Sequence, residues 1–192
     1  MILVTEDNQR IVNILTEAFA DNRSVNYVVK QGQHRVDHIR HLMRYAVATC
    51  RDFGEVWLSP DRQACALTML PDTKRTTVAS VRRDIALVRS STGLRNVYKT
   101  LHREGQIKAR HPKDPFCHLW FLGVSSAYQG QGLGSALLEE LIRHYDDQRR
   151  EIHLETSTLR NIPWYEKFGF EIYHELNLTY PLYMMRRTIK ES

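Results

Sequence analysis

The sequence has no long uncharged apolar run, and its mean hydropathy is −0.45. Because a membrane-spanning helix needs about 20 consecutive apolar residues, we expect no such span. The first ten residues contain no charged leader ahead of an apolar stretch, so we also expect no secretory signal. Only six prolines and nine glycines interrupt the 192 residues. This composition predicts one globular domain over residues 1–192 that buries roughly 70% of its unfolded surface.

Cysteine is also scarce. The three cysteines, Cys50, Cys65 and Cys117, are far apart in the sequence, and no CxxC pair is present. Closely spaced cysteine pairs are the usual signature of structural zinc sites and of dithiol redox sites. We therefore expect free thiols in a reducing cytoplasm, with no disulfide and no bound metal.

Neither sign of charge dominates strongly. Lys and Arg (27) exceed Asp and Glu (22) by five, and the sequence pI is near 9.2. Opposite charges are interspersed, and no interleaving of basic and aromatic residues or helix-turn-helix pattern is present. This mild positive balance is compatible with a polyanionic small molecule, and we expect neither a nucleic-acid partner nor a membrane partner. The sequence gives no indication of the oligomeric state.

Hydrophobic periodicity predicts a chain that mixes helices and strands. Thr5 is the expected start of the first helix, and Asn161 is the expected cap of the last one. Residues 21–33 lack clear periodicity and are expected to form a loop with a short element at 27–29. Helices are expected at residues 5–19, 35–53, 78–88, 94–101, 134–145 and 162–167. Strands are expected at residues 55–58, 64–70, 118–124, 152–156, 170–176 and 182–185. Residues 71–115 then form a helical insertion between two strands of one sheet.

Glycine is concentrated at one place. Four of the nine glycines lie between Gly123 and Gly134, where a strand passes through a loop into a helix. Without Cβ atoms these residues let backbone amides approach an anion, and the helix N-terminus adds unsatisfied N–H donors. We interpret this segment as a phosphate-binding loop rather than a tight turn with small residues for packing. Its residues are Gln129, Gly130, Gln131, Gly132, Leu133, Gly134 and Ser135.

Two phosphate-binding motifs were compared with this loop. The Walker A pattern GxxxxGK[ST] is absent. A dinucleotide-binding fingerprint is a closer alternative, with Glu155 about twenty residues on for a ribose hydroxyl. Against it, Ser125–Gln129 separate the strand from the first loop glycine, and Ser135 occupies the place of the third glycine. Too little chain also follows Glu155 to complete a doubly wound domain.

A better match is the pattern Q/R-x-x-G-x-G/A, supplied by Gln129, Gly132 and Gly134. A second segment, Asn161 followed by YEKFGF at residues 165–170, supports it independently. Together these motifs resemble the acetyl-CoA-binding half of the GNAT (GCN5-related) N-acetyltransferase superfamily over about residues 115–175. LETS at 154–157, and RNIPWYEKFGF at 160–170, are similar to the branch that contains puromycin N-acetyltransferase.

The resemblance implies both a fold and an activity. The fold would be α/β (α+β), a single twisted, mostly antiparallel mixed sheet flanked by helices. Residues 71–115 would be inserted between the third and fourth strands, ahead of an acetyl-CoA-binding core at 116–175. The activity would be direct transfer of acetyl from acetyl-CoA to an amine, most simply a small molecule, in a ternary complex. A non-catalytic CoA-binding regulatory module and an NAD-binding protein remain alternatives.

The resemblance also implies roles for particular residues. Backbone groups of Leu122, Gly123 and Val124, together with Asn161, would bind the pantetheine arm, and a strand N–H near Leu122 would polarise the thioester carbonyl. Tyr165, whose unperturbed pKa of about 10 lies above that of a thiol, would protonate the departing thiolate.

The general base is left open by the sequence. His118 lies at the register where histone acetyltransferases carry a glutamate base, and a histidine can accept an amine proton near neutral pH. A packing role for His118 is an equal alternative. Glu155 acting through water, or as a structural carboxylate, is another.

Overall fold

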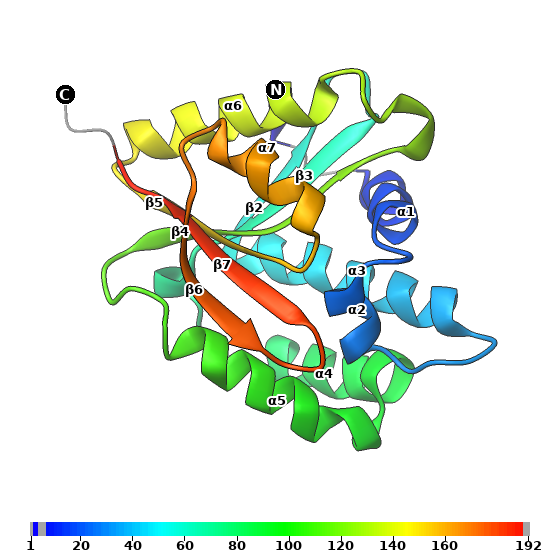
Figure 1. The fold of residues 1–192 in the computed structure, drawn as a ribbon. Coiled ribbons are helices and arrows are strands. Elements are labelled where there is room, and N and C mark those ends of the chain that lie inside the picture. Colours follow the sequence, from blue (N-terminus) through cyan, green and yellow to red (C-terminus); the bar gives the residue numbers. More distant parts are fainter. Residues whose placement is uncertain (1, 4–6, 190–192) are drawn as a thin grey trace.

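The structure is a computed structural model, and it describes residues 2–3 and 7–189. Seven strands form one sheet in the order β1-β2-β3-β4-β5-β7-β6 (Figure 1). The strands are β1 (Ile2–Leu3), β2 (Gly54–Leu58), β3 (Ala64–Met69), β4 (Phe116–Val124), β5 (Glu151–Thr156), β6 (Glu171–Asn177) and β7 (Pro181–Arg187). Among the described strands β4 and β5 are the parallel neighbours and the other pairs are antiparallel. The expected mixed, mostly antiparallel sheet is confirmed.

Helices cover both faces of this sheet. The α-helices are α1 (Asn8–Ala18), α2 (Arg23–Val28), α3 (Arg35–Phe53), α4 (Val78–Leu87), α5 (Leu94–Lys108), α6 (Leu133–Asp147) and α7 (Ile162–Glu166). One buried cluster joins α1 and α3 to the sheet, and a second joins α6 and α7 to its other face. The expected insertion is present between β3 and β4, where α4 and α5 lie, and α5 runs below the β6–β7 hairpin (Figure 1).

The feature of the sheet that matters for function is an opening between β4 and β5. The two strands pair only over the first three residues of β4, where Phe116 faces Glu151 and His118 faces His153. Beyond His118, β5 pairs with β7 alone. On the other side β4 stays paired with β3, with a bulge at Trp120 because Leu67 faces Phe121 and Thr68 faces Leu119. The central strand therefore leaves one neighbour while it keeps the other.

Several sequence predictions are corrected by the structure. The expected loop at 21–33 contains helix α2, whose N-terminus is capped by the Asn22 side chain accepting from Val25 N at 3.0 Å. Helix 35–53 is confirmed at both ends. The first helix begins at Asn8, and the predicted cap Thr5 lies outside the described residues.

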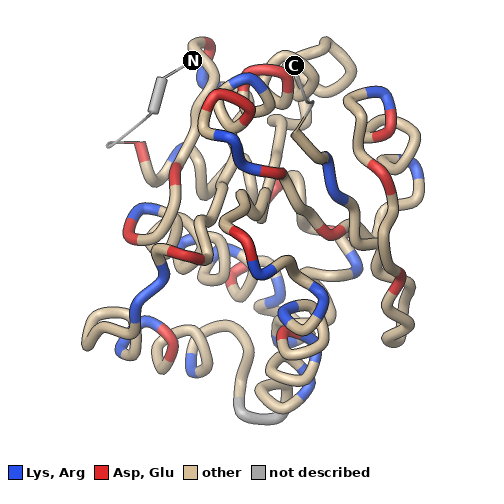
Figure 2. Tube along the Cα trace, turned by 90° about the vertical axis from the view of Figure 1, so that its left-hand side faces the viewer, with Lys and Arg blue, Asp and Glu red and all other residues tan. Residues whose placement is uncertain are grey.

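Charge and hydropathy agree with the expectations from composition. Figure 2 shows basic residues interspersed with acidic ones along the described chain. Among the helices that the structure describes, none combines the length and the apolar character needed to cross a membrane. The three cysteines are buried and unpaired.

Candidate functional site

The glycine-rich loop presents a row of free backbone amides. Gly130 (φ 78°) and Gly132 (φ 84°) lie in the left-handed region, and α6 begins directly after them. Within the described chain, no backbone N–H from residue 130 to residue 135 donates a hydrogen bond. The side chains of Gln129 and Gln131 donate instead to Val124 O and Ala127 O, at 3.2 and 3.3 Å. Six main-chain donors at a helix N-terminus are therefore available to an anion.

The opening in the sheet starts at this loop. Ser125 N donates to Gln63 O on the β3 side at 2.8 Å. Backbone groups of successive strand residues alternate in direction, so those of Leu122 and Val124 point to the other side, where β5 has separated. Gly123, which lies between them, is crowded on its side-chain position. A Cβ there would lie 2.9 Å from Leu15 Cδ2 on α1. We explain this glycine by helix packing rather than by a ligand.

Helix α7 borders the same opening on the α6 side. Trp164 Nε1 donates to Ser135 Oγ at 3.0 Å, which ties α7 to the start of α6. Asn161 does not cap α7 through its side chain, contrary to the prediction, because it has helical dihedrals itself (φ −84°, ψ −20°). Tyr165 is buried in the α6-side cluster, and its hydroxyl makes no hydrogen bond within the described residues. Burial raises the pKa of Tyr165, so this phenol stays protonated.

The face of the sheet opposite α6 and α7 carries a cluster of two histidines and a glutamate. His118 Nε2 lies 2.8 Å from Glu155 Oε2, and His111 Nε2 lies 3.0 Å from Glu155 Oε1. Cys117, the neighbour of His118, belongs to the α6-side core, so the two side chains point to opposite faces. From the sequence, His118 and Glu155 were separate candidates for the base, and the structure joins them. His111, which follows the C-terminal end of α5, joins them without having been predicted.

Electrostatics couples the members of this cluster. Burial alone would raise the pKa of Glu155, but the charges and hydrogen bonds of His118 and His111 hold it well below its usual range. Burial alone would lower the pKa of His118, but the Glu155 carboxylate beside it, by charge and by hydrogen bond, raises that pKa above its usual value. His118 Nδ1 makes no hydrogen bond within the described chain and is not one of its fully buried unpartnered atoms. Nδ1 is therefore the ring nitrogen of His118 that remains free while Glu155 holds Nε2.

These three side chains also bear on the question of a metal. Their donor atoms all lie within 4.8 Å of one another, close enough to share a cation. Both histidines, however, direct Nε2 at different oxygens of Glu155 at ordinary hydrogen-bond distances. The geometry is that of a shared proton network, and the absence of a metal stays a prediction.

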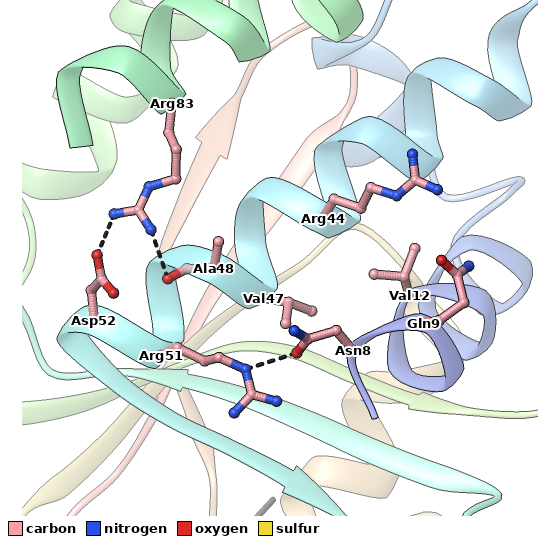
Figure 3. A pocket seen from close by; sticks show the side chains of 9 residues that line it. All are labelled: Asn8, Gln9, Val12, Arg44, Val47, Ala48, Arg51, Asp52 and Arg83. Atoms are coloured by element: carbon pink, nitrogen blue, oxygen red, sulfur yellow. Dashed lines mark hydrogen bonds and ion pairs between the residues drawn. The ribbon is translucent and has the colours of Figure 1, made fainter. Parts of the chain in front are cut away.

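A concave surface of about 400 Å³ lies away from the opening, between α1, α3 and α4 (Figure 3). Two of the arginines that line it are engaged by the protein itself. Arg83 binds Asp52 and donates to Ala48 O at 3.0 Å, and Arg51 Nε donates to Asn8 Oδ1 at 2.7 Å. None of the residues predicted for the site lines this surface.

Comparison with known proteins agrees with this geometry. Residues 98–170 match the model of the acetyltransferase (GNAT) family, a segment that contains the loop, His118, Glu155 and Tyr165. A 65-residue stretch is 42% identical to an uncharacterized N-acetyltransferase of Schizosaccharomyces pombe. Residues 98–170 are therefore similar to the GNAT acetyltransferase family. The stretch that matches the yeast relative covers 32% of this chain, and it spans only about a quarter (26%) of the length of that relative.

Solved structures resemble this chain over the whole fold. A protein of Corynebacterium glutamicum, described as histone acetyltransferase HPA2 and related acetyltransferase, has a TM-score of 0.73 at 21% identity, covering 100% of this chain and 96% of that one. Arylalkylamine N-acetyltransferase 2 of Aedes aegypti has a TM-score of 0.64 at 16% identity, with coverages of 95% and 94%. A ribosomal-protein alanine N-acetyltransferase of Escherichia coli has a TM-score of 0.56 at 17% identity, covering 100% and 94%. At these identities the likeness establishes the fold, which small-molecule and protein acetyltransferases share.

Proposed function

We propose that this protein is a GNAT acetyltransferase that transfers an acetyl group from acetyl-CoA to an amine. One observation carries the proposal: the opening between β4 and β5 has six free amides at one end and a carboxylate-held histidine at the other. The amides suit the diphosphate of CoA. The histidine suits an amine that must lose a proton to become a nucleophile.

The chain also offers groups for the rest of the cosubstrate. The outward backbone groups of Leu122 and Val124 form an unpaired strand edge that can hydrogen-bond the amides of the pantetheine arm. The Asn161 side chain makes no hydrogen bond within the described residues and borders α7, so its amide is available for the same arm. A Cβ at Gly134 would lie 3.4 Å from Val124 Cγ2 and 3.7 Å from Leu122 Cδ2, which places the start of α6 directly beside this strand edge.

The chemistry follows from where the titratable groups lie. His118 accepts the amine proton at Nδ1, while Glu155 holds the ring through Nε2. The amine nitrogen then forms a bond to the acetyl carbon as the carbon–sulfur bond breaks, and the Leu122 N–H stabilises charge on the carbonyl oxygen. Tyr165 donates a hydrogen bond to the leaving thiolate. Burial raises the pKa of Tyr165, which favours this hydrogen bond over complete transfer of the phenol proton. Complete transfer requires that burial also raise the pKa of the CoA thiol.

The acceptor is proposed to be a small amine. The face that carries His118 is enclosed by α2, α5 and the β6–β7 hairpin, which meet at Arg103. Arg103 Nη2 donates to Ser24 Oγ on α2 at 2.7 Å, and Arg103 Nε donates to the Tyr180 hydroxyl at 3.2 Å. Ile107 of α5 lies in the same buried cluster as residues of β6 and β7. An enclosed face of this kind leaves little room for a folded protein substrate.

The test is release of free thiol from acetyl-CoA in the presence of single amines. The panel should contain arylalkylamines, an amino sugar, puromycin (for the predicted branch) and a lysine peptide. Turnover with a small amine at a rate well above that with the peptide supports the proposal. Micromolar CoA binding without turnover on any amine would favour the non-catalytic module, and binding of NAD without binding of CoA would refute the assignment of the loop.

A further inference from the structure

A second concave surface, of about 480 Å³, lies where the two ends of the insertion meet. One side is the segment after the short helix Pro71–Thr73, with Lys74 and Arg75, and the other is the end of α5, with Lys108. His111 and Phe116 also line it, and none of the described residues that line it is acidic. We call these five residues the basic pocket.

The charge of the basic pocket is not neutralised by the protein. Within the part of the chain that the structure describes, the side chains of Lys74, Arg75 and Lys108 form no ion pair or hydrogen bond. The nearby Asp72 is held by Arg150 through two contacts, of 2.7 and 2.9 Å. That hydrogen bonding from Arg150 lowers the pKa of Asp72, so the carboxylate stays charged and committed to its partner.

The surface in Figure 3 provides the contrast. There Arg83 already has the Asp52 carboxylate, so part of its charge is compensated within the protein. In the basic pocket three cations face a shared hollow with no carboxylate between them. Like charges held together in this way repel one another until an anion binds, and an anion gains from all three at once.

His111 connects the basic pocket to the candidate catalytic cluster. Its Nε2 lies 3.0 Å from Glu155 Oε1, and its ring centroid lies 5.3 Å from that of His118. Its Nδ1 makes no hydrogen bond within the described residues. Nδ1 is therefore the ring nitrogen that can contact an oxyanion in the pocket while Nε2 keeps its contact with Glu155.

We infer that the basic pocket binds the phosphate or carboxylate group of a small molecule. Lys74, Arg75 and Lys108 supply the charge, His111 supplies a directed donor, and the volume suits a group larger than a single ion. The anionic group belongs either to a separate ligand or to the far end of the acetyl acceptor, and its recognition chemistry is the same in both cases. Binding of an anion to the basic pocket does not depend on the proposed acetyl transfer. Any effect of that anion on turnover rests on the proposed function.

Calorimetric titration with inorganic phosphate tests the binding. The full chain is first saturated with CoA, so that the loop at residues 130–135 cannot take up the added phosphate. The variant Lys108→Gln should weaken phosphate binding by about two- to fivefold, since the contact of one solvent-exposed cation with the anion is lost. Combined Lys74→Gln and Arg75→Gln should weaken it further. Arg82→Gln, an equal change of charge on an exposed residue of α4 outside the pocket, should leave it unchanged.

A second measurement locates the anion. Side-chain nitrogen resonances of His111 should shift on addition of phosphate, while those of the exposed His34 should not. Saturable binding that all the pocket variants retain, or no saturable binding at all, would overturn the inference. The pocket cations are exposed, so these variants should fold normally, and CoA binding measured on the same samples confirms it.

Kinetics then separates the two sources of the anion. If the anionic group belongs to the acceptor, phosphate competes with it and raises KM for an amine that carries a carboxylate or a phosphate. KM for an amine without an anionic group stays unaltered. If it belongs to a separate ligand, phosphate changes kcat for every amine.

A protein that binds phosphate at the pocket yet acetylates nothing would contradict the proposed function alone. A protein that acetylates amines without binding phosphate there would contradict the pocket alone.

Discussion

Replacing Gly132 by alanine tests the phosphate-binding loop most directly. Gly132 has φ 84° and ψ −6°, directly before the first turn of α6. An alanine in this left-handed conformation costs about 1–2 kcal/mol, although its Cβ would meet no atom within 4 Å. The loop therefore either keeps its shape at that cost or relaxes and turns its amides away from the ligand.

The two effects can be separated by a matched control. Gly32 also has a positive φ, of 112°, and open space around its missing Cβ, but it lies between α2 and α3. Gly32→Ala and Gly132→Ala should both reduce the free energy of unfolding by a similar amount. Only Gly132→Ala should weaken CoA binding, by about 10- to 150-fold, if one charge-assisted hydrogen bond of about 1.5–3 kcal/mol is lost.

The assay is calorimetric titration with CoA, alongside denaturant unfolding of each variant without ligand. Gly132→Ala with wild-type affinity for CoA and the same loss of stability as Gly32→Ala would refute the reasoning. In that case the free amides at residues 130–135 would be a structural feature of the turn, and the diphosphate would have to bind elsewhere.

Other predictions concern the groups that handle protons. His118→Ala should lower kcat by about 10²- to 10⁴-fold with little change in CoA affinity, as seen in single-turnover thiol release. In the wild type, kcat/KM should rise with pH through the raised pKa of His118, because only the neutral ring accepts a proton. Glu155→Gln removes the negative charge that raises this pKa, so the rise should move to lower pH; an unmoved profile would exclude His118 as the base. Tyr165→Phe should slow thiol release without loosening CoA, and equal turnover would remove the hydroxyl from the mechanism. Prolonged chelation should leave turnover unaltered, whereas loss restored by a divalent cation would show that His111, His118 and Glu155 hold a metal.

The fold alone does not identify the substrate of this protein. The similar structures include acetyltransferases named for arylalkylamines and for a ribosomal protein. In this chain the contacts of Arg103 with Ser24 and Tyr180 join α2, α5 and the β6–β7 hairpin. These segments lie largely outside the glycine-rich and YEKFGF motifs, so the acceptor depends on parts of the sequence that carry no motif.

The sequence by itself determined the half of the site that depends on local backbone geometry. Gly130 and Gly132 permit left-handed dihedrals, and a helix start supplies free amides whatever packs around it. Both consequences follow from a few consecutive residues. The long helix at 35–53 was predictable for the same reason, since its apolar period is local.

Tertiary structure decided the rest, because the remaining features need residues far apart in the sequence. The separation of β4 from β5 arises from pairing that stops after His118 while β7 continues alongside β5. The contact of His111 with Glu155 bridges 44 residues, and that of His118 with Glu155 bridges 37. The basic pocket likewise combines residues 74–75 with 108–116. A side chain's partners, and hence its charge state, are set by packing, and no local pattern in the sequence records them.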